Sequence, residues 1–522
     1  MSNLFLDAVY KYDTYTENGA ISHSTTGSEL VNYFAKCGTF RDRYLKQVFA
    51  DMNAIWYASP KIALQIIFYN RLISRKTKGF LNSEKVQRGQ GNRSEFRSSI
   101  TWLARYQPET LYKNLWLIPI VGSWKDLWHE DLLNELDRSA VYNLVLKGIN
   151  DDYNKDLLAK LLPRIRSKSN TKNERHQALN KFAFGLLKVL KWTPTQYRKF
   201  KSSGKAHEFQ QKMCDNQWGH LDFNKIPGQA LFMLVNNEGR YDKKTTLKRH
   251  DLEKRYIEWI KEQPTAKFTG YVYKLMGKVS PKMSLAQKIT LDKQFDGLIE
   301  LAKQDDTEGK GFKENIWCAL DTSGSMRCAV ADTTAYDVCV SLGIYFSALN
   351  EGAFKDQVIM FDSTSKVKKL KGSFTSKVQQ LSKTSAMGST NFQSVIKEIV
   401  RIRTKNPTIP IEDYPTTLLI VSDMQFNATG TPQTNYEAAM QKLAEVGLPK
   451  IRIIWWWVIG RGTDFPSNMD EEGVVMLGGF DGAIISLFMD GEERAINEKP
   501  RMNLYEAMLK TLNQEILTKI CI

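Results

Sequence analysis

Cysteine and histidine are scarce in this sequence, and neither is spaced as a metal site or a catalytic pair requires. The six cysteines contain no C-x-x-C pair, which argues against a zinc knuckle or a disulfide framework and fits a reducing compartment. The six histidines form no H-E-x-x-H motif, and no G-x-S-x-G elbow occurs. We therefore expect that the protein is not an enzyme.

Long apolar runs are also absent. No stretch reaches the about 18 consecutive apolar residues of a membrane-spanning helix. Residues 1–19 lack the basic start, apolar middle and cleavage site of a secretory signal. We expect a cytoplasmic protein with no membrane partner, and its 522 residues should divide into at least two domains.

Positive charge is in excess and unevenly distributed. The chain has 73 Lys and Arg against 57 Asp and Glu, a net charge of +16. From residue 313 onward 22 basic residues face 24 acidic ones, so residues 1–312 carry a net +18. Such an asymmetry suggests a polyanionic partner for the first part, most often nucleic acid. A basic surface that serves only solubility is the alternative.

The first part of the chain has the pattern of successive helices. Apolar residues recur at three- and four-residue spacing over Pro60–Ile73, Leu157–Leu162, Ala178–Leu190 and Leu252–Ile260. Amphipathic helices with short connections are typical of helical-repeat solenoids, although no fixed period is present. We predict an all-α, HEAT-like repeat domain over residues 1–310, built as a solenoid or a ring.

A charged segment at residues 303–315 precedes a different pattern, in which strands and helices alternate. Strands are predicted at Ile316–Leu320, Gln357–Phe361, Thr417–Val421 and Ile451–Ile459, and helices at 334–350, within 374–383, at 391–403, 435–446 and near 503–518. Continuous apolar strands between helices predict a doubly wound, mostly parallel α/β sheet over residues 311–522. Trp455-Trp456-Trp457 should then lie in the core rather than stack on bases.

Polar residues follow three of these strands or precede their helices. Asp321, Ser323 and Ser325 come directly after the first strand, Thr390 precedes the helix at 391–403, and Asp423 follows the strand Thr417–Val421. Strand ends of one sheet meet at one edge, so we expect two carboxylates and three hydroxyls to converge. An all-oxygen set suits Mg²⁺ first, with Mn²⁺ or Ca²⁺ also possible. Helix capping by Asp and Ser is the alternative.

This order of residues resembles the metal-ion-dependent adhesion site of von Willebrand factor A domains. By that resemblance Asp321, Ser323 and Ser325 form the first ligand loop, Thr390 the second and Asp423 the third. The resemblance implies that the serines, usually with Thr390, bind the metal directly and that the aspartates act partly through water. It also implies that a protein partner donates a carboxylate to the cation.

The whole chain resembles the Ro autoantigen (TROVE-module) architecture, and in detail the DUF2828 family. The resemblance is carried by short motifs: Glu17-Asn18-Gly19-Ala20, Arg88-Gly89-Gln90-Gly91-Asn92-Arg93, Gly122-Ser123-Trp124-Lys125-Asp126-Leu127, Thr193-Pro194-Thr195-Gln196-Tyr197 and Ser422-Asp423-Met424-Gln425-Phe426. It implies a ring of helical repeats followed by a von Willebrand A domain. It also implies RNA binding, with single-stranded 3′ ends inside the ring and structured RNA on its basic outer face.

Phosphate contacts require Lys and Arg clusters on a preformed surface. The candidates are Arg71, Arg75, Lys76, Arg88, Arg93, Arg97, Arg164, Arg166, Lys168, Lys172, Arg198, Lys199, Lys201 and Lys205. For any one cluster the alternative is an ordinary solvated helix face.

Two functions from different classes are compatible with the sequence. The first is an RNA-binding ribonucleoprotein component that holds structured or misfolded RNA, with a cation site for an acidic ligand. The second is a protein-scaffolding or assembly component that uses the cation site to bind a partner, without nucleic acid.

Overall fold

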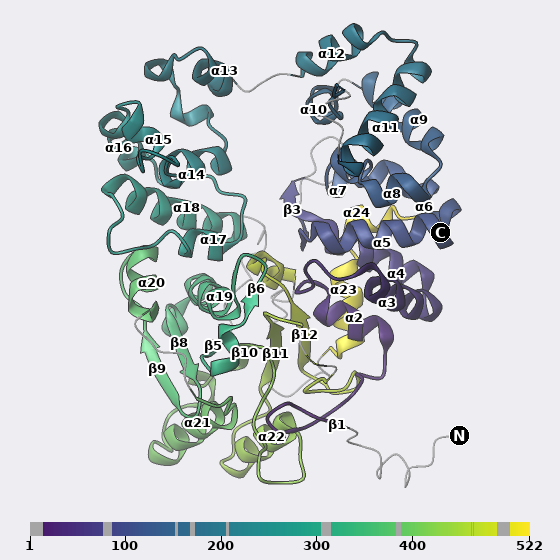
Figure 1. Cartoon of the computed structure of the whole chain (residues 1–522). Coiled ribbons are helices and arrows are strands. Elements are labelled where there is room, and N and C mark those ends of the chain that lie inside the picture. Colours follow the sequence, from purple (N-terminus) through teal and green to yellow (C-terminus); the bar gives the residue numbers. More distant parts are fainter. Residues whose placement is uncertain are drawn as a thin grey trace. The chain divides into compact units, whose positions relative to one another are not determined.

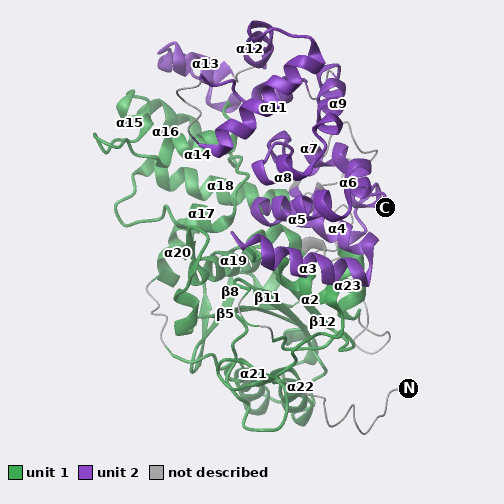
Figure 2. Cartoon of the chain, turned by 45° about the vertical axis from the view of Figure 1, so that its right-hand side comes forward, with its two compact units in different colours: residues 1–40, 226–511 green, residues 41–225, 512–522 purple. Residues whose placement is uncertain are grey.

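The computed structural model describes residues 14–76, 86–151, 155–167, 173–204, 208–303, 315–382, 388–460, 462, 464–487 and 502–522. The chain divides into two compact units (Figure 2). Unit 1 comprises residues 1–40 and 226–511, and unit 2 comprises residues 41–225 and 512–522. Each unit is therefore assembled from two segments that are separate in the sequence.

A six-stranded sheet forms the centre of unit 1, with the strand order β12-β11-β10-β5-β8-β9 (Figure 1). Its strands are β5 (Ile316–Asp321), β8 (Gln357–Phe361), β9 (Ser365–Lys369), β10 (Thr417–Ser422), β11 (Arg452–Trp457) and β12 (Val474–Gly478). All neighbouring strands are parallel except the edge pair β8–β9. The accompanying helices are α19 (Ala335–Leu349), α20 (Phe374–Ser382), α21 (Gln393–Lys405), α22 (Asn435–Glu445) and α23 (Leu504–Leu512). This is the strand order of a doubly wound fold, and the predicted fold class is confirmed.

The three consecutive tryptophans of β11 lie in the core, as predicted. Trp455, Trp456 and Trp457 are all 0% exposed. The ring of Trp456 lies 4.9 Å from that of Phe346 on α19, whereas the ring of Trp455 lies 5.2 Å from that of Phe392, just before α21. Successive side chains of a strand point to opposite faces, so α19 and the start of α21 cover opposite faces of the sheet.

The predicted strands and helices of this part are present, and the structure adds two strands. The strand β9 was missed because its sequence, SKVKK, has no apolar run, as is common at an exposed sheet edge. The strand β12 was also missed. The single helix predicted near residues 503–518 is two helices, α23 and α24 (Glu515–Thr518), because Gln514 between them has an extended backbone.

The remaining elements of unit 1 are mainly helical. They are β1 (Thr14–Tyr15), β2 (Ile21–Ser22), α2 (Glu29–Cys37), α14 (Gly228–Asn236), α15 (Thr246–Arg249), α16 (Glu253–Glu262), α17 (Val272–Met276), α18 (Leu285–Lys303), β6 (Ala329–Val330) and β7 (Thr333–Thr334). The helix predicted at Leu252–Ile260 is α16. Its Tyr256 hydroxyl lies 2.8 Å from the Thr290 hydroxyl of α18 in a buried hydrogen bond.

Unit 2 is helical, apart from one two-stranded sheet. Its elements are α3 (Leu45–Ala58), α4 (Pro60–Arg71), β3 (Ile73–Lys76), β4 (Val86–Gln90), α5 (Arg93–Tyr106), α6 (Pro108–Asn114), α7 (Ile118–Val121), α8 (Glu130–Glu135), α9 (Arg138–Ile149), α10 (Lys155–Leu161), α11 (Glu174–Leu190), α12 (Pro194–Ser203), α13 (Glu208–Cys214) and α24. The three helices predicted in this unit are α4, α10 and α11. The pair β3–β4 was not predicted.

The compact units do not follow the predicted boundary between residues 310 and 311. Helix α18 lies before that boundary, yet it packs on α19 and α20, which lie after it. Its Phe295 ring stacks on that of Phe374 at 4.4 Å and meets the ring of Tyr345 edge-on at 6.5 Å. Apolar packing therefore places α18 in unit 1, although its sequence pattern continues the helical part. Residues 304–314, around the predicted boundary, lie outside the described residues.

Two further predictions bear on the surroundings of the protein. All six cysteines are free thiols. Among the described residues, no helix is both long and apolar enough to cross a lipid bilayer.

Candidate metal site and nucleic-acid interface

The predicted metal residues begin at the carboxyl ends of β5 and β10, the neighbouring central strands of the sheet. The two strands pair in parallel register, which brings Asp321 and Asp423 to the same edge. The Ser422 hydroxyl donates a hydrogen bond to Oδ2 of Asp321. The backbone N–H of Ser323 donates to Oδ1 of the same carboxylate at 2.9 Å. Open α/β sheets bind ligands at this edge, where the connections change direction.

The two carboxylates of this edge are withdrawn from solvent. Asp321 and Asp423 are each 0% exposed. Burial, followed by the negative charge of Asp423, raises the pKa of Asp321 to about 7, against the hydrogen bonds from Ser422 and Ser323. Two buried carboxylates of like charge are unfavourable unless a cation or a proton lies between them. The edge is therefore a place where positive charge is stabilised.

Hydroxyl groups from two loops join these carboxylates. The Oγ atoms of Ser323 and Ser325 lie 3.1 Å apart. Between them, the N–H of Gly324 donates to the carbonyl of Gly388 at 3.2 Å and so links the first loop to the second, which carries Thr390. Ser323 and Thr390 are each 1% exposed. All five predicted metal residues thus come to one edge of the sheet.

The donor set fits a hard divalent cation. Two carboxylates supply negative charge and three hydroxyls supply neutral oxygens, a composition that suits Mg²⁺ and allows Mn²⁺ or Ca²⁺. Among the described residues there is no group of three His, Cys, Asp or Glu side chains that could bind a metal. The chemistry of this edge therefore depends on its Ser and Thr hydroxyls, and cation binding itself remains a prediction.

Residues outside the predicted set hold this edge together. Asn427 clamps the backbone of Thr390: its Oδ1 accepts from the Thr390 N–H at 3.1 Å, and its own N–H donates to the Thr390 carbonyl at 2.9 Å. Beneath the edge, the thiol of Cys339 donates to the Val421 carbonyl at 3.3 Å. Burial, and then the charge of Asp321, raises the pKa of this thiol. Asn427 carried no signal, because a single amide in a loop belongs to no periodic pattern.

A hairpin from the start of the chain lies along the same edge. Its strands β1 and β2 are antiparallel, and its tip follows the loop after Asp423. The Thr16 hydroxyl donates to the Phe426 carbonyl at 2.6 Å, and the Glu17 N–H donates to Oε1 of Gln425 at 2.7 Å. Gly19 forms a β-bridge with Asn427. The hairpin was not predicted, although its tip is the Glu17–Ala20 motif.

Two predicted phosphate contacts in unit 2 are wrong, because the side chains are buried. Arg71 is 1% exposed and Arg88 is 2% exposed. The Nε of Arg71 donates to Oδ2 of Asp126 at 2.8 Å, and Arg97 donates to Oδ1 of the same carboxylate at 2.8 Å. Burial lowers the pKa of Arg71, and Asp126 opposes that shift. Buried guanidinium groups of this kind organise the helical core and cannot reach a phosphate.

The other predicted cations differ in their surroundings. Arg93, Arg164, Arg166, Arg198 and Lys199 are exposed, and Arg97 and Lys201 are half-buried. Side chains outside the described residues are those of Arg75 and Lys76, which lie in β3, and of Lys168, Lys172 and Lys205.

Three cations of unit 2 gather around α10. The Lys201 amine, on α12, donates to the Lys160 carbonyl at 3.0 Å. Burial lowers the pKa of Lys201, and the positive charges of Arg164 and Lys125 lower it further. Lys125 is exposed and was not among the predicted contacts, because a single lysine in its motif has no cationic neighbour in the sequence. We call Lys125, Arg164 and Lys201 the α10 cluster.

The net charge of the chain follows the compact units. Unit 2 contains 34 Lys and Arg against 18 Asp and Glu, whereas unit 1 contains 39 of each. The whole net charge of +16 is thus in unit 2. A division of the sequence at residue 312 gives +18 instead, because it also counts residues 226–312, with 16 Lys and Arg against 12 Asp and Glu, and residues 1–40, with 2 against 4.

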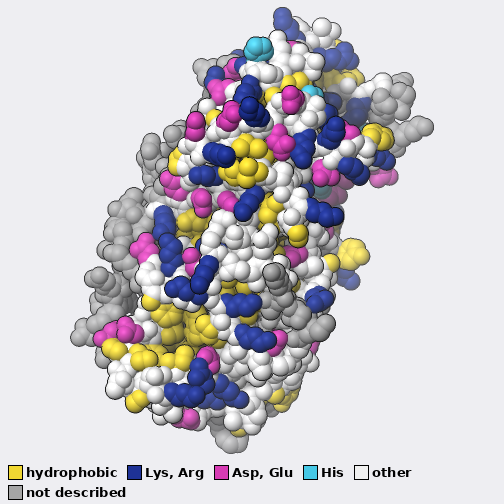
Figure 3. Space-filling view, turned by 90° about the vertical axis from the view of Figure 1, so that its left-hand side faces the viewer, with side chains coloured by type: hydrophobic (Ala, Val, Ile, Leu, Met, Phe, Trp, Pro, Cys, Tyr) yellow, Lys and Arg dark blue, Asp and Glu magenta, His cyan; other side chains and the backbone are white. Residues whose placement is uncertain are grey.

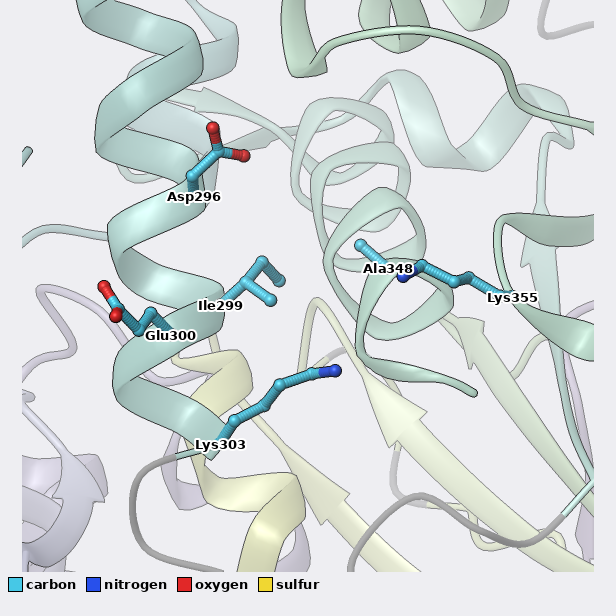
Figure 4. Close-up of a pocket in the computed structure, with 6 residues that line it drawn as sticks. All are labelled: Asp296, Ile299, Glu300, Lys303, Ala348 and Lys355. Carbon is cyan, nitrogen blue, oxygen red and sulfur yellow. The ribbon is translucent and has the colours of Figure 1, made fainter. Parts of the chain in front are cut away.

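Two hollows of unit 1 contain none of the predicted residues. One has a volume of about 410 Å³, and Figure 4 shows Asp296, Glu300 and Lys303 along α18 with Lys355 on the other side. The other has a volume of about 280 Å³ and a largely apolar lining that includes Phe354. On the face shown in Figure 3, hydrophobic side chains gather in the lower part, with Lys and Arg among them.

Two family models match separate parts of the chain. Residues 16–183 match a domain of unknown function, DUF2828, and residues 317–517 match another, DUF7788. The resemblance to DUF2828 is confirmed. The DUF2828 segment contains the tip of the hairpin and much of unit 2. The DUF7788 segment contains all five predicted metal residues.

Similar proteins cover both segments. The chain is 24% identical to an uncharacterized protein, L728, of Acanthamoeba polyphaga mimivirus over 514 residues, which are 92% of this chain and 85% of the viral protein. A crystal structure of the RO (RSR) protein of Deinococcus radiodurans is similar with a TM-score of 0.35 and 13% identity, over 88% of this chain and 98% of that chain.

Proposed function

We propose that the protein binds RNA on unit 2 and holds a divalent cation at the sheet edge of unit 1, where the cation takes an acidic ligand. The charge distribution carries the first part of this proposal. Unit 2 has 34 basic residues against 18 acidic ones, and unit 1 is balanced at 39 each. An excess confined to one unit fits a polyanionic ligand of that unit.

The α10 cluster is the best-supported phosphate contact. Burial is the main cause of the lowered pKa of Lys201, and the positive charges of Arg164 and Lys125 lower it further. A bound phosphate would offset the repulsion from these two charges. Arg164 and Lys125 are exposed, so a nucleic-acid backbone can approach them. The preference for RNA over DNA rests on the resemblance of the sequence to the Ro architecture.

For the sheet edge we propose binding rather than catalysis. Asp321 and Asp423 would hold Mg²⁺ together with the hydroxyls of Ser323, Ser325 and Thr390. Three neutral ligands out of five leave the cation able to attract a further carboxylate from a protein partner. The free cysteines favour a cytoplasmic location.

The test compares nucleic-acid binding by the full chain and two triple variants. Lys125→Ala/Arg164→Ala/Lys201→Ala removes the α10 cluster. Lys366→Ala/Lys369→Ala/Lys371→Ala removes three exposed lysines of unit 1 and is the matched control. Fluorescence anisotropy with a single-stranded RNA should show a loss of about tenfold or more for the first variant, with a salt dependence shallower by about two to three contacts. The control should bind as the wild type does.

Copurifying material distinguishes the possible ligands. Protein purified at low salt should have a high ratio of absorbance at 260 to 280 nm that falls after RNase treatment and persists after DNase. A ratio that falls with DNase alone would overturn the preference for RNA. A protein-like ratio from the start, together with no RNA binding, would overturn the RNA part and favour the scaffolding function.

A further inference from the structure

The hairpin β1–β2 reaches the cation edge from far away in the sequence. Its tip contacts residues 425–427, in the loop that follows Asp423, through the hydrogen bonds of Thr16 and Glu17 and the bridge of Gly19 to Asn427. Gly19 has φ +79°, a conformation that favours glycine, and it closes the turn by donating its N–H to the Thr16 carbonyl at 3.0 Å. This turn presents Asn18 to the loops of the edge.

The Asn18 amide joins two of the three ligand loops. Its Nδ2 donates to the carbonyl of Gln425, in the third loop, at 2.5 Å and to Oγ1 of Thr390, in the second, at 3.4 Å. Asn427 holds only the backbone of Thr390. The hydroxyl that would bind the cation is therefore contacted by a residue 372 positions earlier in the chain.

The first ligand loop is fixed in a different way. Ser323, two residues along the chain, and Ser422, on the neighbouring strand β10, donate hydrogen bonds to the carboxylate of Asp321, so both of its contacts lie within the α/β part. Among the described residues, the one hydrogen bond of the Thr390 hydroxyl comes from Asn18, outside the α/β part. The second loop thus depends on the hairpin for the orientation of its ligand oxygen.

We propose that Asn18 is a positioning residue for Thr390, and that the hairpin tip is an integral part of the cation site. This inference rests on the cation site proposed above. A donor to one lone pair of the Thr390 oxygen leaves the other lone pair directed at the cation. Outer-shell partners of this kind typically contribute about 10- to 100-fold to metal affinity. The contact is long and Asn18 is exposed, so we expect the lower end of that range.

Docking of the hairpin and binding of the cation should be thermodynamically linked. If the docked hairpin raises the affinity for a cation, the cation must favour the docked hairpin by the same factor. Mg²⁺ should then slow hydrogen exchange of the amides in residues 14–22. A hairpin that merely packs on the surface of unit 1 would not respond to Mg²⁺.

The experiment measures Mg²⁺ affinity by calorimetry and hydrogen exchange of residues 14–22 by mass spectrometry in the full chain. Asn18→Ala removes the donor to Thr390. Thr16→Val is the matched control, because it removes the bond to Phe426 from the same tip without touching a predicted ligand. Asp423→Ala is the reference for a lost site. We expect about tenfold weaker Mg²⁺ binding for Asn18→Ala, a change below about twofold for Thr16→Val, and Mg²⁺-dependent protection only where Asn18 is present.

The results distinguish a failure of the cation site from a failure of the role assigned to Asn18. If the wild type binds no Mg²⁺, and so behaves as Asp423→Ala does, the cation site and this inference are both wrong. If the wild type binds Mg²⁺ and Asn18→Ala binds it equally well, only the role of Asn18 is overturned. Equal weakening by Asn18→Ala and Thr16→Val would likewise overturn it, since tip rigidity rather than the amide would then matter.

Discussion

The predicted metal residues lie at the sheet edge of unit 1, and most of the predicted phosphate contacts lie in unit 2. The structure agrees more closely with the first set than with the second. At the sheet edge all five predicted residues come together, from Asp321 to Asp423. In unit 2 two predicted cations, Arg71 and Arg88, are buried. The α10 cluster there includes one cation, Lys125, that was not predicted. The metal residues were thus predicted as a complete group, whereas the cations of unit 2 were predicted only in part.

The reason lies in how each element positions its side chains. The end of a strand in a parallel sheet has a fixed place, because neighbouring strands end at the same edge. A cation on a helix faces either the core or the solvent according to how that helix packs. Arg71, Arg93 and Arg97 all lie in basic stretches of the sequence, yet they are buried, exposed and half-buried, respectively.

The largest expected effect is a loss of stability on removal of the buried cation Arg71. Arg71→Ala removes a guanidinium that is hydrogen-bonded to Asp126 in the core and should destabilise the protein by about 3 kcal/mol, the low end for a broken buried pair, because Arg97 still contacts the carboxylate. Urea denaturation followed by circular dichroism measures this. The exposed Arg93→Ala is the control and should change the free energy of unfolding by less than about 0.5 kcal/mol.

The RNA affinity of folded Arg71→Ala is the second measurement on this variant. Arg71→Ala should leave it unchanged under conditions where the variant is folded, because the side chain is 1% exposed. A specific loss of RNA affinity without loss of stability would mean that Arg71 does reach the ligand, and would reverse the distinction drawn between buried and exposed cations.

The next effect concerns the sheet edge. Mg²⁺ at about 100 times its dissociation constant should stabilise the wild type by about 2.7 kcal/mol, and Asp423→Ala should abolish that gain. Without Mg²⁺ the variant should be no less stable than the wild type, since it loses a like charge beside Asp321. Thermal denaturation with Mg²⁺ or EDTA measures both quantities.

A matched carboxylate serves as the control for that measurement. Asp470 is exposed and lies in unit 1, so Asp470→Ala should keep the full stabilisation by Mg²⁺. If Asp423→Ala fails to fold even in EDTA, the edge is a structural feature rather than a binding site.

The smallest effect concerns a buried cation of unit 1, Lys36, which is 5% exposed and donates to the carbonyls of Gly462 and Asp464. Burial lowers the pKa of Lys36 from 10.5 to about 8, against the charge of Asp464. Between these values the unfolded chain binds more protons than the folded one. The free energy of unfolding should therefore rise with pH, by about 1 kcal/mol from pH 7.5 to 9.

Urea midpoints at the two pH values measure this change. Lys36→Met has no titrating group and should lack that part of the rise. An identical rise in both proteins would show that other groups cause it. Arg71 offers no such response, because a guanidinium stays protonated over this range.

Much of the α/β part could be predicted from sequence, because its central strands are apolar on both faces. The run Trp455–Trp457 is an example, since only a fully covered strand accommodates three tryptophans in succession. The edge strand β9 could not be found, because its exposed lysines give no apolar pattern. The sequence also does not predict that α18 belongs to unit 1, since the helices on which it packs lie beyond the segment that was expected to separate the domains.

The candidate site could be predicted only in part. Asp321, Ser323, Ser325, Thr390 and Asp423 carry a signal in their spacing from strand ends. Asn18 belongs to the motif Glu17-Asn18-Gly19-Ala20, but nothing in that motif predicts a contact with Thr390 or Gln425. Its role depends on a tertiary contact that local chemistry cannot reveal.

The arrangement of unit 2 has a consequence for how the chain is made. Gln514 exchanges hydrogen bonds with the backbone of Arg88, and Cys521 does so with the side chain of Asn114. Residues 226–511, all of them in unit 1, lie between these partners. A ribosome that has released residues 41–225 must therefore synthesise most of the other unit before the helices around Arg88 and Asn114 receive their remaining partners. Until then, the nascent helical unit exposes backbone and side-chain groups that are buried in the finished protein.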